Sequence, residues 1–465
     1  MCGFIAWKQP GLNHRNIAGV VREMDYRGLP EFTGSGRYGD AQFGHVSLPF
    51  TNLDPEVAIQ PIYHGAEGIP NVFVGEIFNW KFLNDDFLEW KVRSDAEFFV
   101  RDFHFHNYGN QKIDLNYMHN YDGFWSFATI LKDKLFACTD YLSQKPVYYR
   151  TDLNVVASEI DVLKNLKGVT RNELFHSNVL KWGYNPGPES PWNEIKQIPP
   201  GHYYLDGVIT KYWDWERVDF SENDSLEDIL KESVKNRLTG EREVAVLLSG
   251  GIDSTIIYNL IKEIHSEEWK YGDEDIPITA IHAENNESHY AELVTKDLLI
   301  VTFDKVSDEK AIKIHQTPVD LGSVKPQIAM AEELKKLGFY AVMTGDGADE
   351  LFGGYRRAKE YDSQHSDIFL ELPYYHLPKL DRTMMRSTVE LRAPFLSPKV
   401  IKYALRVPYE NRMGDKEMLK SVFESYVPQD ILLRAKKPLK IPGIKKFPME
   451  QRLTNNRIWK EMYNG

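Results

Sequence analysis

The sequence predicts two halves, an α+β half built on antiparallel sheets and an α/β half built on a doubly wound parallel sheet. Up to residue 212, short runs of aromatic and β-branched residues are separated by Gly, Asp and Asn turn signals, as in NVFVGEIFNW and GFWSFATILKD. Beyond residue 225, short apolar strands alternate with amphipathic helices, which is typical of a parallel sheet. The length of 465 residues suits two or three domains.

The composition argues against several classes of function. The formal charge of −12 argues against nucleic acid or an anionic membrane as a partner. No apolar run approaches the ~20 residues of a membrane span, and we expect no signal peptide at the start of the chain. The two cysteines exclude a disulfide framework and favour a reducing cytoplasm.

In the first half, the most informative residue is Cys2, which follows the initiator methionine in MCGFIAW. A lipid anchor would need a hydrophobic signal before the cysteine, and myristoylation would need glycine at that position. Two interpretations stay open from this segment. Removal of Met1 would place a nucleophilic thiol beside its own α-amino group, which can act as a general base. Alternatively, Cys2 is a small buried residue at the start of an edge strand.

The boundary between the halves is predicted at residues 213–225, where the acidic stretch ERVDFSENDSLEDILKE leads into an amphipathic helix. We therefore predict domains at residues 2–212 and 225–465. After this helix, strands are expected at 243–249, 278–283, 299–303 and 339–345, with helices at 254–265, 288–298 and 328–338. Doubly wound sheets bind ligands at the carboxyl ends of their strands, so the loops that follow the strands are the candidate sites.

The first such loop is Ser249-Gly250-Gly251-Ile252-Asp253-Ser254, which runs from a strand into a helix. Its glycines let backbone amides approach a ligand closely, and the helix N-terminus favours an anion. Its serine hydroxyls can donate to phosphate oxygens, and Asp253 can hold Mg²⁺. The spacing is not that of a Walker loop.

The second loop, TGDGADELFGGY, spans Thr344 to Tyr355 and carries Asp346, Asp349 and Glu350 within five residues. Carboxylates crowded in this way repel one another unless a cation neutralises them. Because both loops follow strands of one sheet, Mg²⁺ with the phosphates of ATP is the expected cation.

At this pair of loops the sequence resembles a known family. LLSGGIDST, TGDGADELFGGY, STVELRAPFL and LLRAKKPLKIP, over about residues 225–446, are similar to the synthetase domain of glutamine-hydrolysing asparagine synthetases. The relatives of that domain include β-lactam and carbapenam synthetases and lasso-peptide cyclases. YRG, VGEIFN, SDAE, CTDYLSQKPVYY, ASEI and IPPGHYY follow the order of a class II glutamine amidotransferase. The resemblance implies an N-terminal-nucleophile fold for the first half, a four-layer αββα sandwich of two antiparallel sheets between helices.

For the first half, the resemblance implies an amidase site that binds glutamine. Cys2 would attack the side-chain amide, with its own amine as base. Arg27 and Asp95 would hold the α-carboxylate and the α-amino group of glutamine. The backbone amide of Gly75 would contribute to the oxyanion hole, with Glu76 beside it.

For the second half, the resemblance implies an adenylating site that takes ATP and Mg²⁺. Asp253 and Asp349 would bind the metal, and Asp346 would stand at the aspartyl adenylate and the attacking ammonia. Lys436 would contact the leaving phosphates, and Glu390 matches the glutamate of the motif E-x-R-x-P-F. The expected ATP-binding residues are Leu247, Ser249, Gly250, Gly251, Asp253, Ser254, Thr344 and Gly345.

The chain departs from the family in three places. The family reads Asn-Gly-Glu where this chain has Val74-Gly75-Glu76, so a side-chain oxyanion donor is lost from the glutamine site. It reads Arg-Gly-Pro-Asp where this chain has Arg27-Gly28-Leu29-Pro30. The segment between Tyr355 and Asp381 is also much shorter than in typical members.

The sequence thus predicts a cytoplasmic, ATP-dependent amide ligase that converts aspartate, ATP and glutamine to asparagine, AMP, pyrophosphate and glutamate, with glutaminase weakened by Val74. Ammonia would pass between the two sites through an internal tunnel. Two alternatives stay open: a ligase of the same mechanism that acts on another carboxylate, and a non-catalytic regulatory relative. Cys2 argues against the β-lactam branch, whose members tend to lose it, and the intact SGGIDS loop argues against a non-catalytic role. The oligomeric state, including a homo-oligomer, stays open.

Overall fold

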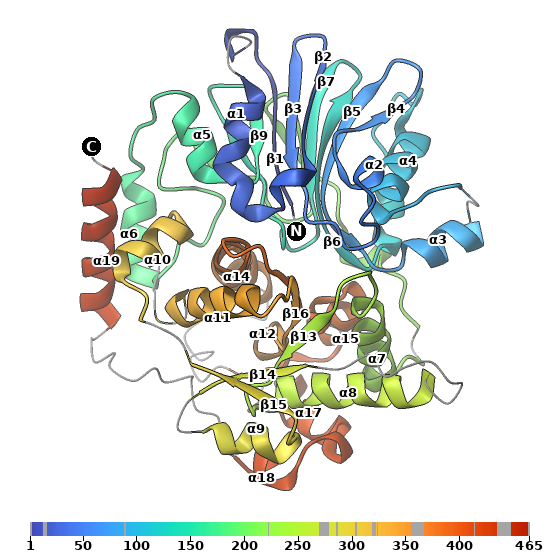
Figure 1. Ribbon diagram of the computed structural model, residues 1–465, viewed down its shortest axis with the longest axis vertical. Helices are drawn as coiled ribbons and strands as arrows, with labels where there is room; N and C mark the ends of the chain where they lie inside the picture. The colour runs from blue at the N-terminus through green and yellow to red at the C-terminus, as the bar shows by residue number, and fades with distance from the viewer. Residues whose placement is uncertain are drawn as a thin grey trace.

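The computed structural model describes residues 2–12, 16–87, 90–221, 223–268, 279–284, 287–302, 305–318, 322, 324–354, 367–412, 414–434 and 448–463. These residues form two six-stranded antiparallel sheets from the first half of the chain and one five-stranded parallel sheet from the second (Figure 1). The predicted fold classes of both halves are therefore confirmed.

The two antiparallel sheets pack face to face. The first sheet has, in spatial order, β10 (Ile195–Gln197), β8 (Tyr148–Arg150), β9 (Val155–Ala157), β1 (Gly3–Lys8), β3 (Ala41–Val46) and β2 (Thr33–Tyr38). The second has β12 (Val208–Lys211), β11 (His202–Leu205), β7 (Lys134–Thr139), β6 (Gly123–Leu131), β5 (Ile69–Ile77) and β4 (Ile62–His64). An apolar cluster that includes Phe4, Val74 and Phe124 fills the space between them.

Helices cover the outer faces of this sandwich. α1 (Ile17–Val21) and α5 (Ile160–Leu166) contact the first sheet, and α4 (Asp95–Asn107) contacts the second. The first half therefore has four layers: helices, a sheet, a second sheet and helices (αββα). β6 is buried along its whole length, because one face meets the other sheet and the other meets α4, so its sequence lacks the polar alternation of a half-exposed strand.

The parallel sheet has the order β15 (Leu298–Val301), β14 (Ala280–Ala283), β13 (Val244–Leu247), β16 (Ala341–Met343) and β17 (Glu390–Arg392). β13 and β16 are neighbours, so the two glycine-rich loops that follow them leave the same edge. The helices of this half include α7 (Leu226–Arg237), α8 (Ile252–Glu268), α9 (Ser288–Val294), α11 (Val324–Lys336), α12 (Ala348–Phe352), α14 (Leu377–Met385), α15 (Pro398–Arg406), α16 (Tyr409–Arg412), α17 (Glu417–Val422) and α18 (Gln429–Leu432). The helix expected at 288–298 ends at Val294, because Thr295 is extended and β15 begins at Leu298.

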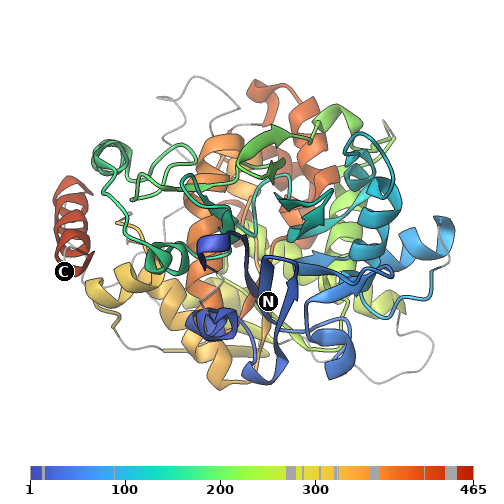
Figure 2. The same cartoon turned by 90° about the horizontal axis from the view of Figure 1, so that it is seen from above.

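The last helix returns to the first half. α19 (Pro448–Tyr463) contacts α6 (Glu173–Trp182) and α10 (Asp308–His315), and the side chains of His176 and Asn456 are hydrogen-bonded at 2.7 Å. Figure 2 shows α19 at one flank of the molecule, with the N-terminus near the middle. In the part of the chain that the structure describes, no helix is both long and apolar enough to cross a membrane.

Candidate active sites

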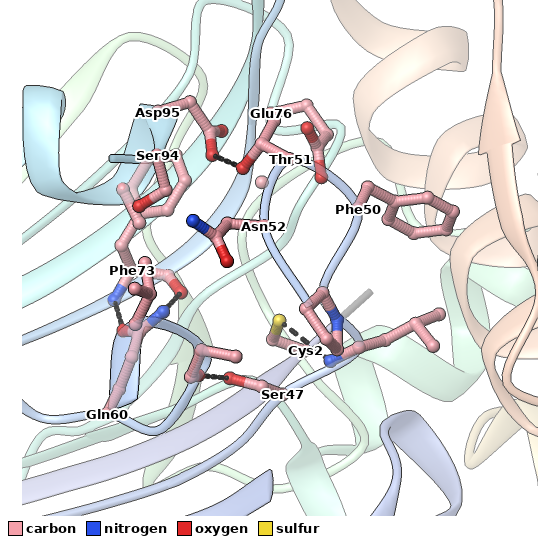
Figure 3. Close-up of a pocket in the computed structure, with 16 residues that line it drawn as sticks. Cys2, Ser47, Phe50, Thr51, Asn52, Gln60, Phe73, Glu76, Ser94 and Asp95 are labelled. Atoms are coloured by element: carbon pink, nitrogen blue, oxygen red, sulfur yellow. Dashed lines mark hydrogen bonds between the residues drawn. The ribbon is translucent and has the colours of Figure 1, made fainter. Parts of the chain in front are cut away.

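Cys2 stands immediately before β1 at one end of the sandwich, in the wall of a small pocket (Figure 3). Its side chain is buried, and its Sγ accepts a hydrogen bond from the backbone N–H of Leu48 at 3.3 Å. Burial raises the pKa of the Cys2 thiol, and the Leu48 N–H opposes that effect. Such a thiol needs a base to become a nucleophile.

The pocket wall also contains Gly75, near the C-terminal end of β5. Its φ is +148°, and a Cβ at this position would lie 2.1 Å from the carbonyl oxygen of Phe124, so only glycine fits. Val74 belongs to the same apolar cluster as Cys2, and its side chain offers no hydrogen-bond donor to this site. Asn79 offers no replacement donor, because its side-chain amide is hydrogen-bonded to the carbonyl of Asn120 and the N–H of Asp122.

Two carboxylates occupy one end of the pocket. Asp95, at the start of α4, accepts hydrogen bonds from the Thr51 hydroxyl at 2.7 Å and from the Ile77 N–H at 3.1 Å. Burial raises the pKa of Asp95 to about 6, against the effect of these two bonds. Burial also raises the pKa of Glu76 well above its usual range, and the charges of Asp95 and Glu390 add to the shift. This end of the pocket is therefore acidic.

Arg27 does not line this pocket. Its Nε donates to the carbonyl oxygen of Cys2 at 3.0 Å, one terminal nitrogen donates to Glu159 at 2.5 Å, and the other donates to Asp381 at 2.9 and 3.1 Å. All three nitrogens of this buried guanidinium are thus bound to protein groups. The residue lies behind Cys2, between the two domains, and its predicted role at the α-carboxylate of glutamine stays a prediction.

The Ser249–Ser254 loop connects β13 to the N-terminus of α8. Gly250 has a φ of +72°, and a Cβ there would lie 2.7 Å from the backbone nitrogen of Ala291. The hydroxyls of Ser249 and Ser254 are 3.0 Å apart, which fixes the turn. Leu247 ends β13, as expected from the sequence. A helix of 17 residues starts here, so its N-terminus favours an anion at the loop.

The second loop meets the first. A Cβ on Gly345 would lie 2.5 Å from the Cβ of Asp253, so this glycine allows the loops to touch. Beside it, the Thr344 hydroxyl donates to the carboxylate of Asp346 at 2.6 Å. Burial raises the pKa of Asp346, and the bond from Thr344 and the charge of Lys379 oppose that shift.

Asp253 and Asp349 converge on one lysine that the sequence analysis missed. The Lys416 ammonium forms ion pairs with both carboxylates, and its side chain is 6% exposed. Burial alone would lower the pKa of Lys416, but Asp253 and Asp349 raise it above its usual value. Lys416 has a φ of +61°, a left-handed conformation that is uncommon for lysine and frequent at functional sites.

The donor set at this point fits a hard divalent cation. Asp253 and Asp349 bring carboxylates from two loops to one place, and Mg²⁺ prefers one or two carboxylates completed by phosphate and water oxygens. Arg434 borders the first loop, where it donates to the carbonyl of Gly250 at 3.0 Å. Lys436 lies outside the described residues.

Glu390 lies at the boundary between the halves, not in either loop. It is fully buried in β17, and its carboxylate pairs with Arg392 at 2.8 Å. The Arg392 guanidinium lies over the ring of Phe50, at 4.9 Å, and Phe50 lines the Cys2 pocket. Lys145 also reaches this boundary, where it pairs with Asp381 at 3.3 Å. Buried charged groups therefore lie between the two candidate centres.

Comparisons with known proteins match the two parts of the chain to two different family models. The family model described as asparagine synthase matches residues 225–370 and 361–456, and the model described as a glutamine amidotransferase domain matches residues 1–213. The chain is similar to the glutamine-hydrolysing asparagine synthetase B of Escherichia coli, with 25% identity over 90% of this chain and 77% of the relative. It is also similar to the glutamine-hydrolysing asparagine synthetase 3 of Arabidopsis thaliana, with 24% identity over 94% of this chain and 78% of the relative.

A solved glutamine phosphoribosylpyrophosphate amidotransferase from B. subtilis overlaps 65% of this chain and 81% of its own. The TM-score is 0.33 and the identity 11%, a likeness too weak to carry an argument.

Proposed function

Because the chain belongs to the asparagine synthase family, with an N-terminal glutamine amidotransferase domain, we propose that it amidates the side-chain carboxylate of aspartate with ATP. The products are asparagine, AMP and pyrophosphate. The observation that carries this proposal is the convergence of Asp253 and Asp349 on Lys416 beside the N-terminus of α8.

In the second domain, the Ser249–Ser254 loop and the start of α8 hold the phosphates of ATP, with Leu247, Thr344 and Gly345 at the nucleotide. Mg²⁺, held by Asp253 and Asp349, neutralises phosphate charge when it is bound. Lys416 supplies a fixed positive charge at the same place, where negative charge develops on the departing pyrophosphate.

The reaction at this centre has two steps. The side-chain carboxylate of aspartate attacks the α-phosphorus of ATP, and pyrophosphate leaves. Ammonia then attacks the carboxyl carbon of the aspartyl adenylate, and AMP leaves. Asp346, whose pKa is raised by burial, accepts the proton that ammonia loses.

In the first domain, Cys2 releases ammonia from a primary amide, for which the family indicates glutamine. Removal of Met1 exposes the amine that acts as base, and the Gly75 N–H stabilises the oxyanion. The Leu48 N–H is a further backbone donor beside the sulfur. Because Val74 supplies no side-chain donor, glutamine is a poorer nitrogen source than free ammonia.

The test supplies ATP, Mg²⁺ and ammonium with a panel of carboxylates and measures the release of pyrophosphate. Aspartate is expected to exceed glutamate, succinate and β-alanine. A higher rate with another carboxylate would show that this carboxylate, and not aspartate, is the preferred substrate of the same mechanism. No pyrophosphate with any member of the panel would overturn the proposal.

A further inference from the structure

A second cavity lies on the outer side of the sandwich, between β4 and α4, which are in contact with each other (Figure 1). Its volume is about 720 Å³, within the range of cavities that hold small ligands. We call this cavity the α4 groove. It is lined by residues 62–65 of β4 and the turn after it, by Trp90, Lys91 and Arg93 before α4, and by Glu97, Val100, Arg101, His104, Phe105 and Tyr108 of α4 and its end.

Aromatic rings are exposed in this groove. The side chains of Tyr63, Phe105 and Tyr108 are 56%, 63% and 68% exposed. The rings of His64 and His104 are stacked, with their centroids 4.1 Å apart and their planes 3° from parallel. Burial lowers the pKa of both histidines, so the stacked rings are uncharged at neutral pH. Exposed rings of this kind offer faces on which a planar ligand can stack.

The groove is also basic, in a chain whose net charge is −12. Its described lining includes Lys91, Arg93 and Arg101, against one carboxylate, that of Glu97. Arg93 pairs with Glu97 at 2.8 Å, whereas no residue in the described part of the chain forms an ion pair with Lys91 or Arg101. Burial and then the charge of Arg101 lower the pKa of His64, so this guanidinium lies near the stacked rings. Cations beside exposed rings suit an anion that carries a planar group.

The α4 groove and the Cys2 pocket share one wall. Arg93 and Glu97 line the groove, and the three residues between them line the Cys2 pocket. The Glu97 carboxylate accepts hydrogen bonds from the backbone N–H and the guanidinium of Arg93, both at 2.8 Å, and the Glu97 N–H donates to the Ser94 hydroxyl at 3.2 Å. The pair of Arg93 and Glu97 therefore fixes the start of α4, where Asp95 lies.

We propose that the α4 groove binds a nucleoside phosphate, with the base on the exposed rings and the phosphate at the cations, and that this ligand weakens the binding of the amide substrate at Cys2. A phosphate oxygen competes with Glu97 for the guanidinium of Arg93. Displacement of Glu97 loosens the first turn of α4, and with it the position of Asp95. The effect on amide hydrolysis rests on the proposed role of Cys2 as the amidase nucleophile, whereas the binding of the ligand does not.

Binding is measured by isothermal titration calorimetry of the full-length protein with GMP, because ATP would also occupy the proposed adenylating site. GMP should bind more tightly than guanosine, which lacks the anion, and more tightly than inorganic phosphate, which lacks the planar group. An acidic peptide is the other occupant that the charges admit. A hexaglutamate peptide that binds more tightly than GMP, or the absence of GMP binding, would overturn the proposal.

Substitutions at exposed positions locate the ligand. Arg101→Glu should weaken GMP binding by about tenfold or more, because a cation that faces the phosphate becomes an anion. Arg22→Glu makes the same change at an exposed arginine of the same domain outside the groove and should leave the Kd unchanged. Tyr108→Ala removes only a stacking face, so it should weaken GMP by about tenfold and leave the Kd for inorganic phosphate unchanged. An equal Kd for GMP in the unaltered protein and Arg101→Glu would refute the site.

The regulatory part is tested through glutamine hydrolysis by the full-length enzyme. GMP should raise the KM for glutamine by about fivefold. In Cys2→Ala, which cannot hydrolyse the amide, glutamine should raise the Kd for GMP by a similar factor, because coupling between two binding sites is reciprocal. Glu97→Gln should still bind GMP but lose the effect on KM, since the nucleotide then displaces no charged partner of Arg93. An unchanged KM with GMP bound to the unaltered enzyme would contradict the regulation.

Two results separate this inference from the proposed function. If the enzyme without GMP hydrolyses no glutamine above the level of Cys2→Ala, the amidase role of Cys2 and its regulation fail together, and the binding assay alone decides the α4 groove. If the enzyme hydrolyses glutamine through Cys2 and GMP does not bind, the amidase role stands and only the inference fails.

Discussion

The guanidinium of Arg27 donates two hydrogen bonds to the carboxylate of Asp381, at 2.9 and 3.1 Å, across the boundary between the two domains. The same guanidinium holds the carbonyl oxygen of Cys2. Asp381 lies in α14, which contacts β17 at the edge of the parallel sheet. The backbone of the candidate nucleophile is thus tied to the second domain through one buried ion pair.

Asp381→Asn should destabilise the protein by about 3–5 kcal/mol, because it leaves the charges of Arg27 and Lys145 without their shared buried partner. Urea unfolding measures the change in the free energy of unfolding. Lys399→Met breaks an exposed pair with Glu232 and should cost about 1 kcal/mol or less. Equal effects of the two substitutions would contradict the role of the buried pair.

The ion pair between Arg27 and Asp381 should also affect how the stability of the protein depends on pH. Burial alone would raise the pKa of Asp381, but Arg27 and Lys145 hold it below its usual value. The stabilisation is therefore fully present above the unfolded-state pKa of about 3.9 and is lost as the pH falls through the lowered pKa. Asp381→Asn should remove this acid-dependent loss.

Lys416→Met should reduce ATP–pyrophosphate exchange by about 10²–10³, because it removes the charge that faces the departing pyrophosphate. Asp253→Ala and Asp349→Ala should abolish the exchange while the fold is kept. Lys420→Met alters a more exposed lysine in α17, the helix that begins directly after Lys416, and this variant should catalyse the exchange normally. A normal rate of ATP–pyrophosphate exchange in Lys416→Met would show that Lys416 does not act at this site.

Cys2→Ala should lose amide-dependent synthesis and keep ammonia-dependent synthesis, because the two centres are separate. The intact mass of the active enzyme should lack Met1, since the exposed amine is the base. A retained Met1 in an enzyme that hydrolyses amides would contradict this mechanism.

Val74→Asn should raise the kcat for glutamine hydrolysis, because one oxyanion donor is worth about 10²–10³ in rate. The ammonia-dependent rate should not change. The buried amide is expected to lower stability by about 1–3 kcal/mol, which circular dichroism during thermal unfolding measures. If wild type already uses glutamine as fast as ammonia and the variant gains nothing, the oxyanion hole is complete without a side chain at this position.

The sequence was sufficient for the two fold classes and the glycine-rich loops, because strand periodicity and glycine spacing are local signals. It was not sufficient for Lys416, which follows Asp349 by many residues and reaches it only through the packing of α17 against α12. No sequence pattern indicated the ion pair between Arg27 and Asp381, because the two residues are more than 350 positions apart. The acidic pocket is lined by residues from five separate segments, which no local pattern brings together.

The most direct test of the central claim follows oxygen from aspartate into AMP. Aspartate labelled with ¹⁸O in its side-chain carboxylate is incubated with ATP, Mg²⁺ and ammonium, and the products are analysed by mass spectrometry. Attack of the carboxylate on the α-phosphorus predicts asparagine and AMP that carries one ¹⁸O atom for each asparagine formed. Unlabelled AMP, or ADP with labelled phosphate, would contradict the aspartyl adenylate.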